Sequence, residues 1–253
     1  MIPYTFMVKT ILRPVALELM LRSLRKFFPD APVVIADDSP EPYPEIGEKY
    51  GCSHHLFDPD IGIGHCYNWM VDNWIETPYL VLLDDDFVFT EDTKIDNFVP
   101  WLDAGVVDLI GGDVFNVPRR CFQGFIGRFE CSNKKGRIAP NTITLRKYRR
   151  EWIRHIVGID VTMNFWMATT ESVRKTRWDE ALKVCRHEDF FLRYIGYKPK
   201  EDRVEGYRAA FMKGVVVHHD NKSARNAAYQ ALRRDRFPQF RQVFIEKWGF
   251  EFV

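Results

Sequence analysis

The chain has 253 residues, of which 46% are hydrophobic and 15% aromatic, and its formal net charge is +1. This composition excludes a disordered chain and suits one large α/β domain or two small ones. The five cysteines include no Cys-x-x-Cys pair, which favours free thiols over a disulfide framework or a zinc site, with a Cys121–Cys131 bridge as the alternative.

The first part of the chain alternates predicted strands and helices. Residues 4–9 form a strand, residues 14–28 carry leucines at helical spacing after a proline suited to the first helical turn, and residues 32–36 form a second strand. A strand, a helix and a strand at this spacing predict a βαβ unit and therefore a parallel sheet. The second strand ends in Asp37 and Asp38, which are candidates for hydrogen bonds to a base or a ribose.

The segment Asp60-Ile-Gly-Ile-Gly-His-Cys-Tyr-Asn68 precedes or begins a helix. Two glycines in this position let the backbone approach a diphosphate, although the spacing is that of neither a Rossmann motif nor a P-loop. We assign Asn68, together with Thr10 and Arg13 from the loop after the first strand, to nucleotide binding.

Residues 80–83 form a short buried strand that ends in Asp84, Asp85 and Asp86. Three adjacent carboxylates repel one another, so a folded chain keeps them together when a cation lies among them. The carboxyl ends of central strands are also where α/β sheets bind ligands. We therefore predict that Asp84 and Asp86 hold a divalent cation, Mn²⁺ or Mg²⁺, with Asp84 and Asp85 also on the nucleotide. An acidic surface turn is the alternative.

The remaining elements are predicted as helices at 45–50, 93–102 and 171–176, a helix beginning at 187, strands near 56–57 and at 107–110, 161–168 and 214–217, and a basic helical tail at 224–248 that breaks at Pro238. Between residues 119 and 154 the only acids are Glu130 and Glu151, and the pattern favours antiparallel strands. This basic region is a solvated face or a surface for an acidic acceptor or anionic lipid headgroups. No nucleic-acid motif accompanies the charge, so we expect no nucleic acid as a partner.

Two later segments carry candidate catalytic and metal-binding groups. Glu188 and Asp189 stand in the first turn of a helix, where the helix dipole alone would favour them, and either is a candidate base. His219 ends a strand and is a candidate third metal ligand, because Mn²⁺ accepts both oxygen and imidazole ligands. Four further residues are assigned to the acceptor or the diphosphate: Asp160, Asn164, His187 and Lys222.

No apolar run in the chain reaches the 18 or so residues that a membrane span needs, and residues 1–10 lack the apolar core of a signal peptide. We therefore expect a cytoplasmic protein, with the basic region as its peripheral membrane contact. The sequence sets no oligomeric state.

Taken in order, six segments resemble the GT-A glycosyltransferases, and among them the β-1,4-N-acetylgalactosaminyltransferases. The segments are Val-Ile-Ala-Asp-Asp-Ser (34–39), Leu-Asp-Asp-Asp-Phe-Val-Phe-Thr (83–90), Asp-Leu-Ile-Gly-Gly (108–112), Asp-Val-Thr-Met-Asn-Phe-Trp (160–166), His-Glu-Asp-Phe-Phe-Leu (187–192) and Val-Val-Val-His-His-Asp-Asn-Lys (215–222). The resemblance covers roughly residues 4–222, and residues 113–155 match poorly.

The resemblance implies a GT-A fold, with a mostly parallel central sheet flanked by helices, a smaller antiparallel sheet on the acceptor side and a C-terminal helical tail. Residues 1–222 would be one catalytic domain, divided into a nucleotide-binding half (1–112) and an acceptor half (113–222), with residues 223–253 as the tail. The implied ligands are a UDP-sugar donor, a divalent metal and a glycan or glycolipid acceptor.

Position by position, the resemblance places Asp38 at the uracil and ribose, residues 84–86 at the ribose and metal, His219 at the metal, and Asp189 at the carboxylate that activates the acceptor. We therefore predict Asp189 as the base, with Glu188 in reserve. The predicted function is metal-dependent, inverting transfer of N-acetylgalactosamine, N-acetylglucosamine or a hexose by single displacement. The alternatives are a retaining glycosyltransferase or a nucleotidyltransferase on a similar sheet, and a catalytically inactive sugar- or lipid-binding module.

Overall fold

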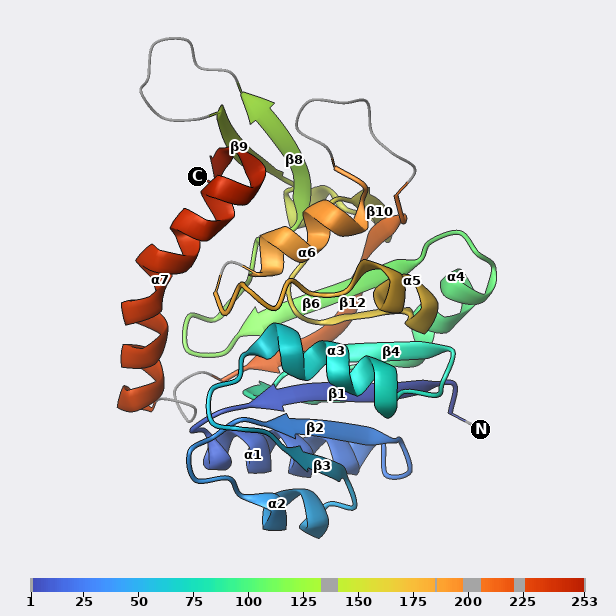
Figure 1. Ribbon diagram of the computed structural model, residues 1–253. Coiled ribbons are helices and arrows are strands. Elements are labelled where there is room, and N and C mark those ends of the chain that lie inside the picture. The colour runs from blue at the N-terminus through green and yellow to red at the C-terminus, as the bar shows by residue number, and fades with distance from the viewer. Residues whose placement is uncertain (1, 133–140, 185, 198–205, 221–225, 253) are drawn as a thin grey trace.

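The computed structural model describes residues 2–132, 141–184, 186–197, 206–220 and 226–252 (Figure 1). The strands are β1 (Tyr4–Thr10), β2 (Val33–Asp37), β3 (Ser53–Leu56), β4 (Tyr79–Asp84), β5 (Phe87–Val88), β6 (Leu109–Asn116), β7 (Cys121–Phe122), β8 (Gly127–Ser132), β9 (Asn141–Lys147), β10 (Ile156–Ile159), β11 (Trp166–Thr169), β12 (Ala209–His219) and β13 (Phe250–Phe252). The helices are α1 (Pro14–Phe27), α2 (Pro44–Lys49), α3 (Ile63–Asn73), α4 (Val99–Asp103), α5 (Thr170–Thr176), α6 (Arg186–Tyr194) and α7 (Ala227–Trp248), with 3₁₀ turns η1 (Ile95–Phe98) and η2 (Arg150–Trp152).

The large sheet has the strand order β10-β12-β6-β11-β4-β1-β2-β3. Strands β3, β2, β1 and β4 are parallel neighbours, β12 is parallel to β6, and β11 runs antiparallel between β4 and β6. The register places Thr10 opposite Asp37 and Lys9 opposite Asp84, while His219 pairs with Phe87 across β5 and β12. The polar residues that follow the apolar strands therefore gather at one edge of the sheet.

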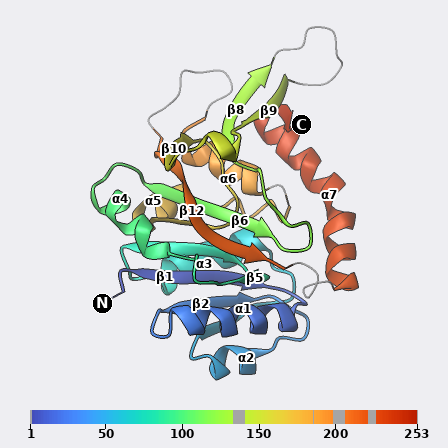
Figure 2. The same cartoon turned by 180° about the vertical axis from the view of Figure 1, so that it is seen from behind.

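Helices cover both faces of this sheet. On one face α1 packs its buried leucines against β1 and β2, together with η1 and α4. On the other face lie α3, α5 and α6, as the two opposite views show (Figures 1 and 2). Both faces of β1 and β2 are thereby removed from water, which is why these two strands are continuously buried and apolar before their polar ends.

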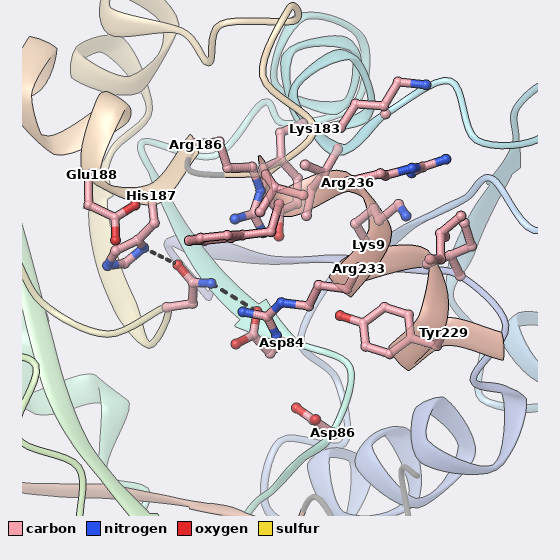
Figure 3. Close-up of a pocket in the computed structure, with 18 of the residues that line it drawn as sticks. Lys9, Asp84, Asp86, Lys183, Arg186, His187, Glu188, Tyr229, Arg233 and Arg236 are labelled. Atoms are coloured by element: carbon pink, nitrogen blue, oxygen red, sulfur yellow. Dashed lines mark hydrogen bonds between the residues drawn. The ribbon is translucent and has the colours of Figure 1, made fainter. Parts of the chain in front are cut away.

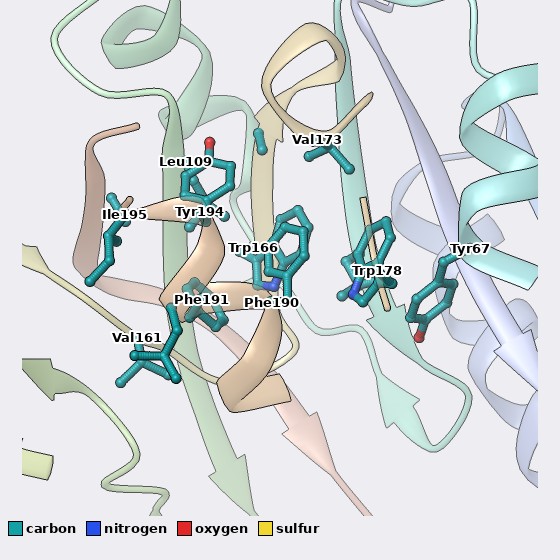
Figure 4. Close-up of a cluster of buried hydrophobic side chains, with 14 of the residues drawn as sticks. Tyr67, Leu109, Val161, Trp166, Val173, Trp178, Phe190, Phe191, Tyr194 and Ile195 are labelled. Carbon is teal, nitrogen blue, oxygen red and sulfur yellow. The ribbon is translucent and has the colours of Figure 1, made fainter. Parts of the chain in front are cut away.

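A cluster of aromatic rings fixes α6 on the sheet (Figure 4). The Phe190 ring stacks on Trp178 with centroids 4.6 Å apart and on Trp166 of β11 with centroids 5.6 Å apart. The Tyr67 ring of α3 lies 4.8 Å from Trp178. Because these rings are buried in close contact, the first turn of α6 is held beside the carboxyl edge of the sheet.

The second sheet has the order β13-β9-β8, with β8 and β9 antiparallel and β13 parallel to β9. Helix α7 leads into β13 and runs across the end of the molecule at which β1, β6 and β12 terminate (Figures 1 and 2). The Asn226 side chain caps the helix by accepting from the Tyr229 amide at 3.0 Å. The expected break at Pro238 is absent. Pro238 has no N–H to donate to the carbonyl of residue 234, but both residues are exposed, so water can hydrate that carbonyl.

The fold predicted from the sequence is confirmed in class, with local differences. The strand expected at 161–168 begins only at Trp166, because Val161 instead bridges to Gly127 in the second sheet. Cys121 is a free thiol, so the alternative Cys121–Cys131 bridge is not formed. Among the helices that the structure describes, none is long and apolar enough to cross a membrane.

Candidate active site

A cavity of about 620 Å³ lies at the carboxyl edge of the large sheet (Figure 3). Its walls come from the strand ends, the first turn of α6 and one face of α7. Five carboxylates line it: Asp38, Asp60, Asp84, Asp86 and Glu188. Lysine and arginine side chains from each wall lie among them and outnumber the carboxylates, so the cavity has an excess of positive charge.

Asp86 and His219 meet in this cavity. The Asp86 Oδ2 atom lies 3.1 Å from Nε2 of His219 and 2.9 Å from Nη1 of Arg13. The other ring nitrogen of His219, Nδ1, lies 2.7 Å from the Gln123 amide nitrogen. Burial acts to raise the pKa of Asp86, but the His219 hydrogen bond and the Arg13 charge lower it overall. Burial opposes protonation of His219, but the Asp86 carboxylate raises the pKa of the imidazole.

The other two acids of the triplet face in different directions. Asp84 lines the cavity and accepts a hydrogen bond from the Asn164 amide at 3.0 Å, while burial and the Asp86 charge raise its pKa. Asp85 is outside the cavity wall, where Thr10 Oγ1 donates to it at 2.8 Å and Arg13 pairs with it. Burial raises the pKa of Asp85 to about 6. Asp84 and Asp86 are thus the two carboxylates available to a ligand.

The donor set suits a divalent cation. Asp86 and His219 are in contact, and Asp84 lines the same cavity, although the described residues contain no preformed group of three metal-ligating side chains. Carboxylate oxygens and an imidazole nitrogen are ligands that Mn²⁺ accepts. Arg13 contacts both Asp85 and Asp86 and supplies the positive charge that these carboxylates need.

Asp38, which directly follows β2, lines the cavity. Its Oδ1 lies 2.5 Å from Nζ of Lys9, and its Oδ2 accepts from the Gly62 amide at 3.2 Å. Asp37 instead accepts from the amides of Ser39 and Tyr43 and shapes the turn after the strand. Of these two acids, Asp38 therefore lines the cavity and Asp37 does not.

Asn68 and the neighbouring glycines have structural partners. The Asn68 amide donates to the Trp178 carbonyl at 2.9 Å and accepts from the Trp178 amide at 2.9 Å, which ties α3 to the loop before α6. Gly62 has φ +111°, a conformation that a side chain disfavours, and a Cβ at Gly64 would lie 2.8 Å from the Asp179 carbonyl oxygen. These glycines thus serve turn geometry and close packing, and only Gly62 lines the cavity.

The two adjacent acids of α6 point to different surroundings. Glu188 lines the cavity, and burial raises its pKa. Asp189 is 0% exposed and outside the cavity wall, held by Lys247 at 2.6 Å, the Trp248 indole N–H at 2.9 Å and Arg193 at 3.1 Å. Consecutive helical residues diverge by about 100° around the axis, so both cannot face the ligand.

Three of the four residues assigned to the acceptor or diphosphate are described. His187 Nδ1 lies 2.7 Å from Oδ1 of Asn164, whose amide nitrogen donates to Asp84, and all three residues line the cavity (Figure 3). Burial and the Arg186 charge lower the pKa of His187 to about 3, so the ring is neutral. Asp160 is outside the cavity wall and accepts from the Phe129 amide. Lys222 lies outside the described residues.

Sequence reasoning missed the wall that α7 provides. Tyr229, Arg233, Arg236 and Phe237 line the cavity, with the Arg13 guanidinium 4.2 Å from the centre of the Tyr229 ring. Arg236 pairs with Asp60 through both guanidinium nitrogens. Residues 229, 233 and 236 are four and three positions apart, and residue 237 follows 233 by four, so all lie on one helical face; this spacing is the signal that could have been used.

Comparison with known proteins supports the resemblance. No protein-family model matches the chain. It is 31% identical over 245 residues to human beta-1,4 N-acetylgalactosaminyltransferase 1, which covers 92% of this chain and 43% of the relative. It is 30% identical over 195 residues to mouse beta-1,4 N-acetylgalactosaminyltransferase 2, which covers 76% of this chain and 36% of the relative. The chain thus spans less than half the length of these relatives.

Solved structures share the fold at low sequence identity. Residues 1–349 of S. aureus TarS match with a TM-score of 0.58 and 16% identity, covering 88% of this chain and 62% of that chain. GalNAc-T7 in complex with UDP, GalNAc and Mn²⁺ matches with a TM-score of 0.59 and 11% identity, covering 86% of this chain and 43% of that chain. The GT-A fold and the resemblance to the β-1,4-N-acetylgalactosaminyltransferases are confirmed.

Proposed function

We propose that this chain transfers a sugar from a UDP-sugar to a hydroxyl group of a glycan or glycolipid acceptor, with inversion at the anomeric carbon. The observation that carries this proposal is the shared cavity: the cation-binding candidates Asp84, Asp86 and His219 and the half-buried carboxylate Glu188 line one space. The relatives named as N-acetylgalactosaminyltransferases support N-acetylgalactosamine as the first sugar to test, before N-acetylglucosamine and hexoses.

Residues at the carboxyl ends of the strands would bind the nucleotide and the cation. Asp38, held by Lys9, would accept hydrogen bonds from the uracil or ribose. Asp84, Asp86 and His219 would hold Mn²⁺ or Mg²⁺, which supplies Lewis acidity to the departing diphosphate. The hydrogen bond from Asn164 orients Asp84, and the contact between His219 and Asp86 keeps these two candidate cation ligands side by side. Arg13 pairs with Asp85 as well as with Asp86, so it would keep one carboxylate partner with a cation on Asp86.

Glu188 is proposed as the base in place of Asp189. The acceptor oxygen attacks the anomeric carbon on the face opposite the diphosphate, its proton passes to the Glu188 carboxylate, and the bond from the carbon to the phosphate oxygen breaks. A base with a raised pKa holds that proton better, and burial raises the pKa of Glu188. Asp189 is committed to Lys247, Trp248 and Arg193 and lies outside the cavity wall.

The test is thermal unfolding with UDP, with and without Mn²⁺, for the wild type, Asp86→Ala and the control Asp30→Ala, which alters an exposed acid in the turn before β2. UDP at about 100 times its Kd adds about 2.7 kcal/mol of stability. For a chain of this size that raises Tm by about 5–10 °C. We expect this Mn²⁺-dependent shift in the wild type and in Asp30→Ala, and its loss in Asp86→Ala. A wild type that UDP never stabilises contradicts the proposal.

Turnover separates the proposal from its alternatives. With UDP-N-acetylgalactosamine and a glycan acceptor, we expect a product of inverted anomeric configuration, detected by nuclear magnetic resonance. Retained configuration would indicate a retaining enzyme, and UDP binding without transfer of any sugar would indicate an inactive binding module.

A further inference from the structure

Most cations of the cavity wall already contact a carboxylate. The pairs are Lys9 with Asp38, Arg13 with Asp85 and Asp86, and both Lys183 and Arg236 with Asp60. Arg186 and Arg233 also line the cavity, and within the described part of the chain neither forms an ion pair. Two positive charges are therefore available to a ligand.

Arg186 begins α6 and lacks an acceptor for part of its guanidinium. Its Nε atom is buried and has no hydrogen-bond partner among the described residues, while the guanidinium carbon lies 5.6 Å from the centre of the Tyr67 ring. A buried N–H group without an acceptor costs free energy that a ligand oxygen can recover. The Arg186 charge acts on both Asp84 and Glu188, so it lies within electrostatic reach of the cation site and of the proposed base.

Arg233 approaches the same space from the opposite wall. It projects from α7 into the cavity, and its charge also acts on Glu188 (Figure 3). Helices α6 and α7 thus each direct one guanidinium at the region that Asp84 and Glu188 border. Paired guanidiniums match the oxygens of a phosphate with several parallel hydrogen bonds.

We propose that Arg186 and Arg233 form an anion site for the terminal phosphate of the donor diphosphate, the phosphate that departs when the sugar is transferred. This inference rests on the proposed function. In a UDP-sugar, this phosphate is the anionic group nearest to the transferred carbon, and so it must lie between the cation carboxylates and the base. The two arginines offset the negative charge that grows on the leaving phosphate oxygen, where a fixed cation is most effective. Helix α7 is then part of the donor site.

The test compares UDP with UMP, each titrated calorimetrically with Mn²⁺ into the wild type, Arg233→Ala, Arg186→Gln and Arg234→Ala. Arg234 is the matched control, because it is exposed on α7 and contacts only its neighbour Asp235 among the described residues. We expect each of the first two variants to bind UDP about 10- to 100-fold more weakly. UMP, which lacks the terminal phosphate, should bind nearly as before, and Arg234→Ala should match the wild type with both ligands.

The second readout is kinetic. Loss of leaving-group stabilisation should lower kcat in Arg233→Ala while the KM of the acceptor stays constant. An unchanged preference for UDP over UMP, with a higher KM for an anionic acceptor, would overturn the proposal and assign the arginines to the acceptor. If the wild type itself fails to bind UDP, the proposed function falls first, so the two failures are distinguishable. Thermal unfolding of each variant verifies that it is folded.

Discussion

Replacing Glu188 or Asp189 of α6 by the corresponding amide, one at a time, tests which of the two is the general base. Glu188→Gln keeps the size of the side chain and removes its capacity to take a proton. A positioned general base contributes about 10²- to 10⁴-fold to a rate, so kcat should fall by that factor. The affinity for UDP should stay unchanged, because Glu188 is assigned to the acceptor side of the cavity.

Asp189→Asn should have the opposite profile. The amide oxygen can still accept from the Trp248 indole, but the ion pairs with Lys247 and Arg193 are lost from a side chain that is 0% exposed. Hydrogen bonds to charged groups contribute about 1.5–3 kcal/mol each, and both cations remain partly hydrated, so we expect a loss of about 2 kcal/mol. This lowers Tm by about 4–8 °C. Turnover should persist well below that temperature.

The assay measures Tm by calorimetry and kcat with UDP-N-acetylgalactosamine at a temperature where both variants are folded. The reasoning is refuted if Asp189→Asn is folded, binds UDP and is inactive while Glu188→Gln turns over, because the base would then be a residue that the structure places outside the cavity.

Four further outcomes follow from the structure. Burial raises the pKa of Glu188, and only its carboxylate form accepts a proton, so kcat should rise with pH through an inflection above the ordinary pKa range of glutamate. An inflection within that range contradicts the assignment. Asn164→Ala removes the hydrogen bond to Asp84 and should weaken calorimetric Mn²⁺–UDP binding about tenfold. Unchanged binding would show that Asp84 needs no such support. Asn226→Ala removes the N-terminal cap of α7 and the hydrogen bond from Asn226 to the Leu12 carbonyl, so it should lower the free energy of unfolding by about 1 kcal/mol and speed proteolysis of the helix. Equal digestion rates for the variant and the wild type would disprove this. Trp178→Ala empties the stack under α6 and should cost about 3–5 kcal/mol in denaturant unfolding, and a loss below 1 kcal/mol would mean that the cluster does not hold α6.

Local hydrophobic patterns in the sequence predicted most of the fold. The strand at 80–83 and the amphipathic spacing of 14–28 predict buried elements because burial of apolar side chains is a local property of the pattern. The strand, helix and strand order predicts parallel pairing, and with it the gathering of Asp38, Asp84 and Asp86 at one edge. The segments that resemble a known family gave the GT-A fold, which the structural comparisons confirm.

What the sequence by itself determined is therefore the order of the elements and the acids that end them, since both depend on neighbours along the chain. Only the tertiary structure decided which acid faces the ligand. Asp189 turns away because Lys247 and Trp248, nearly sixty residues later, meet its carboxylate, and Asp85 turns away because Arg13 and Thr10 hold it. The same reason placed Arg233 in the cavity: the spacing of Tyr229, Arg233 and Arg236 defines one face of α7, but contacts between residues distant in sequence bring that face to the sheet edge.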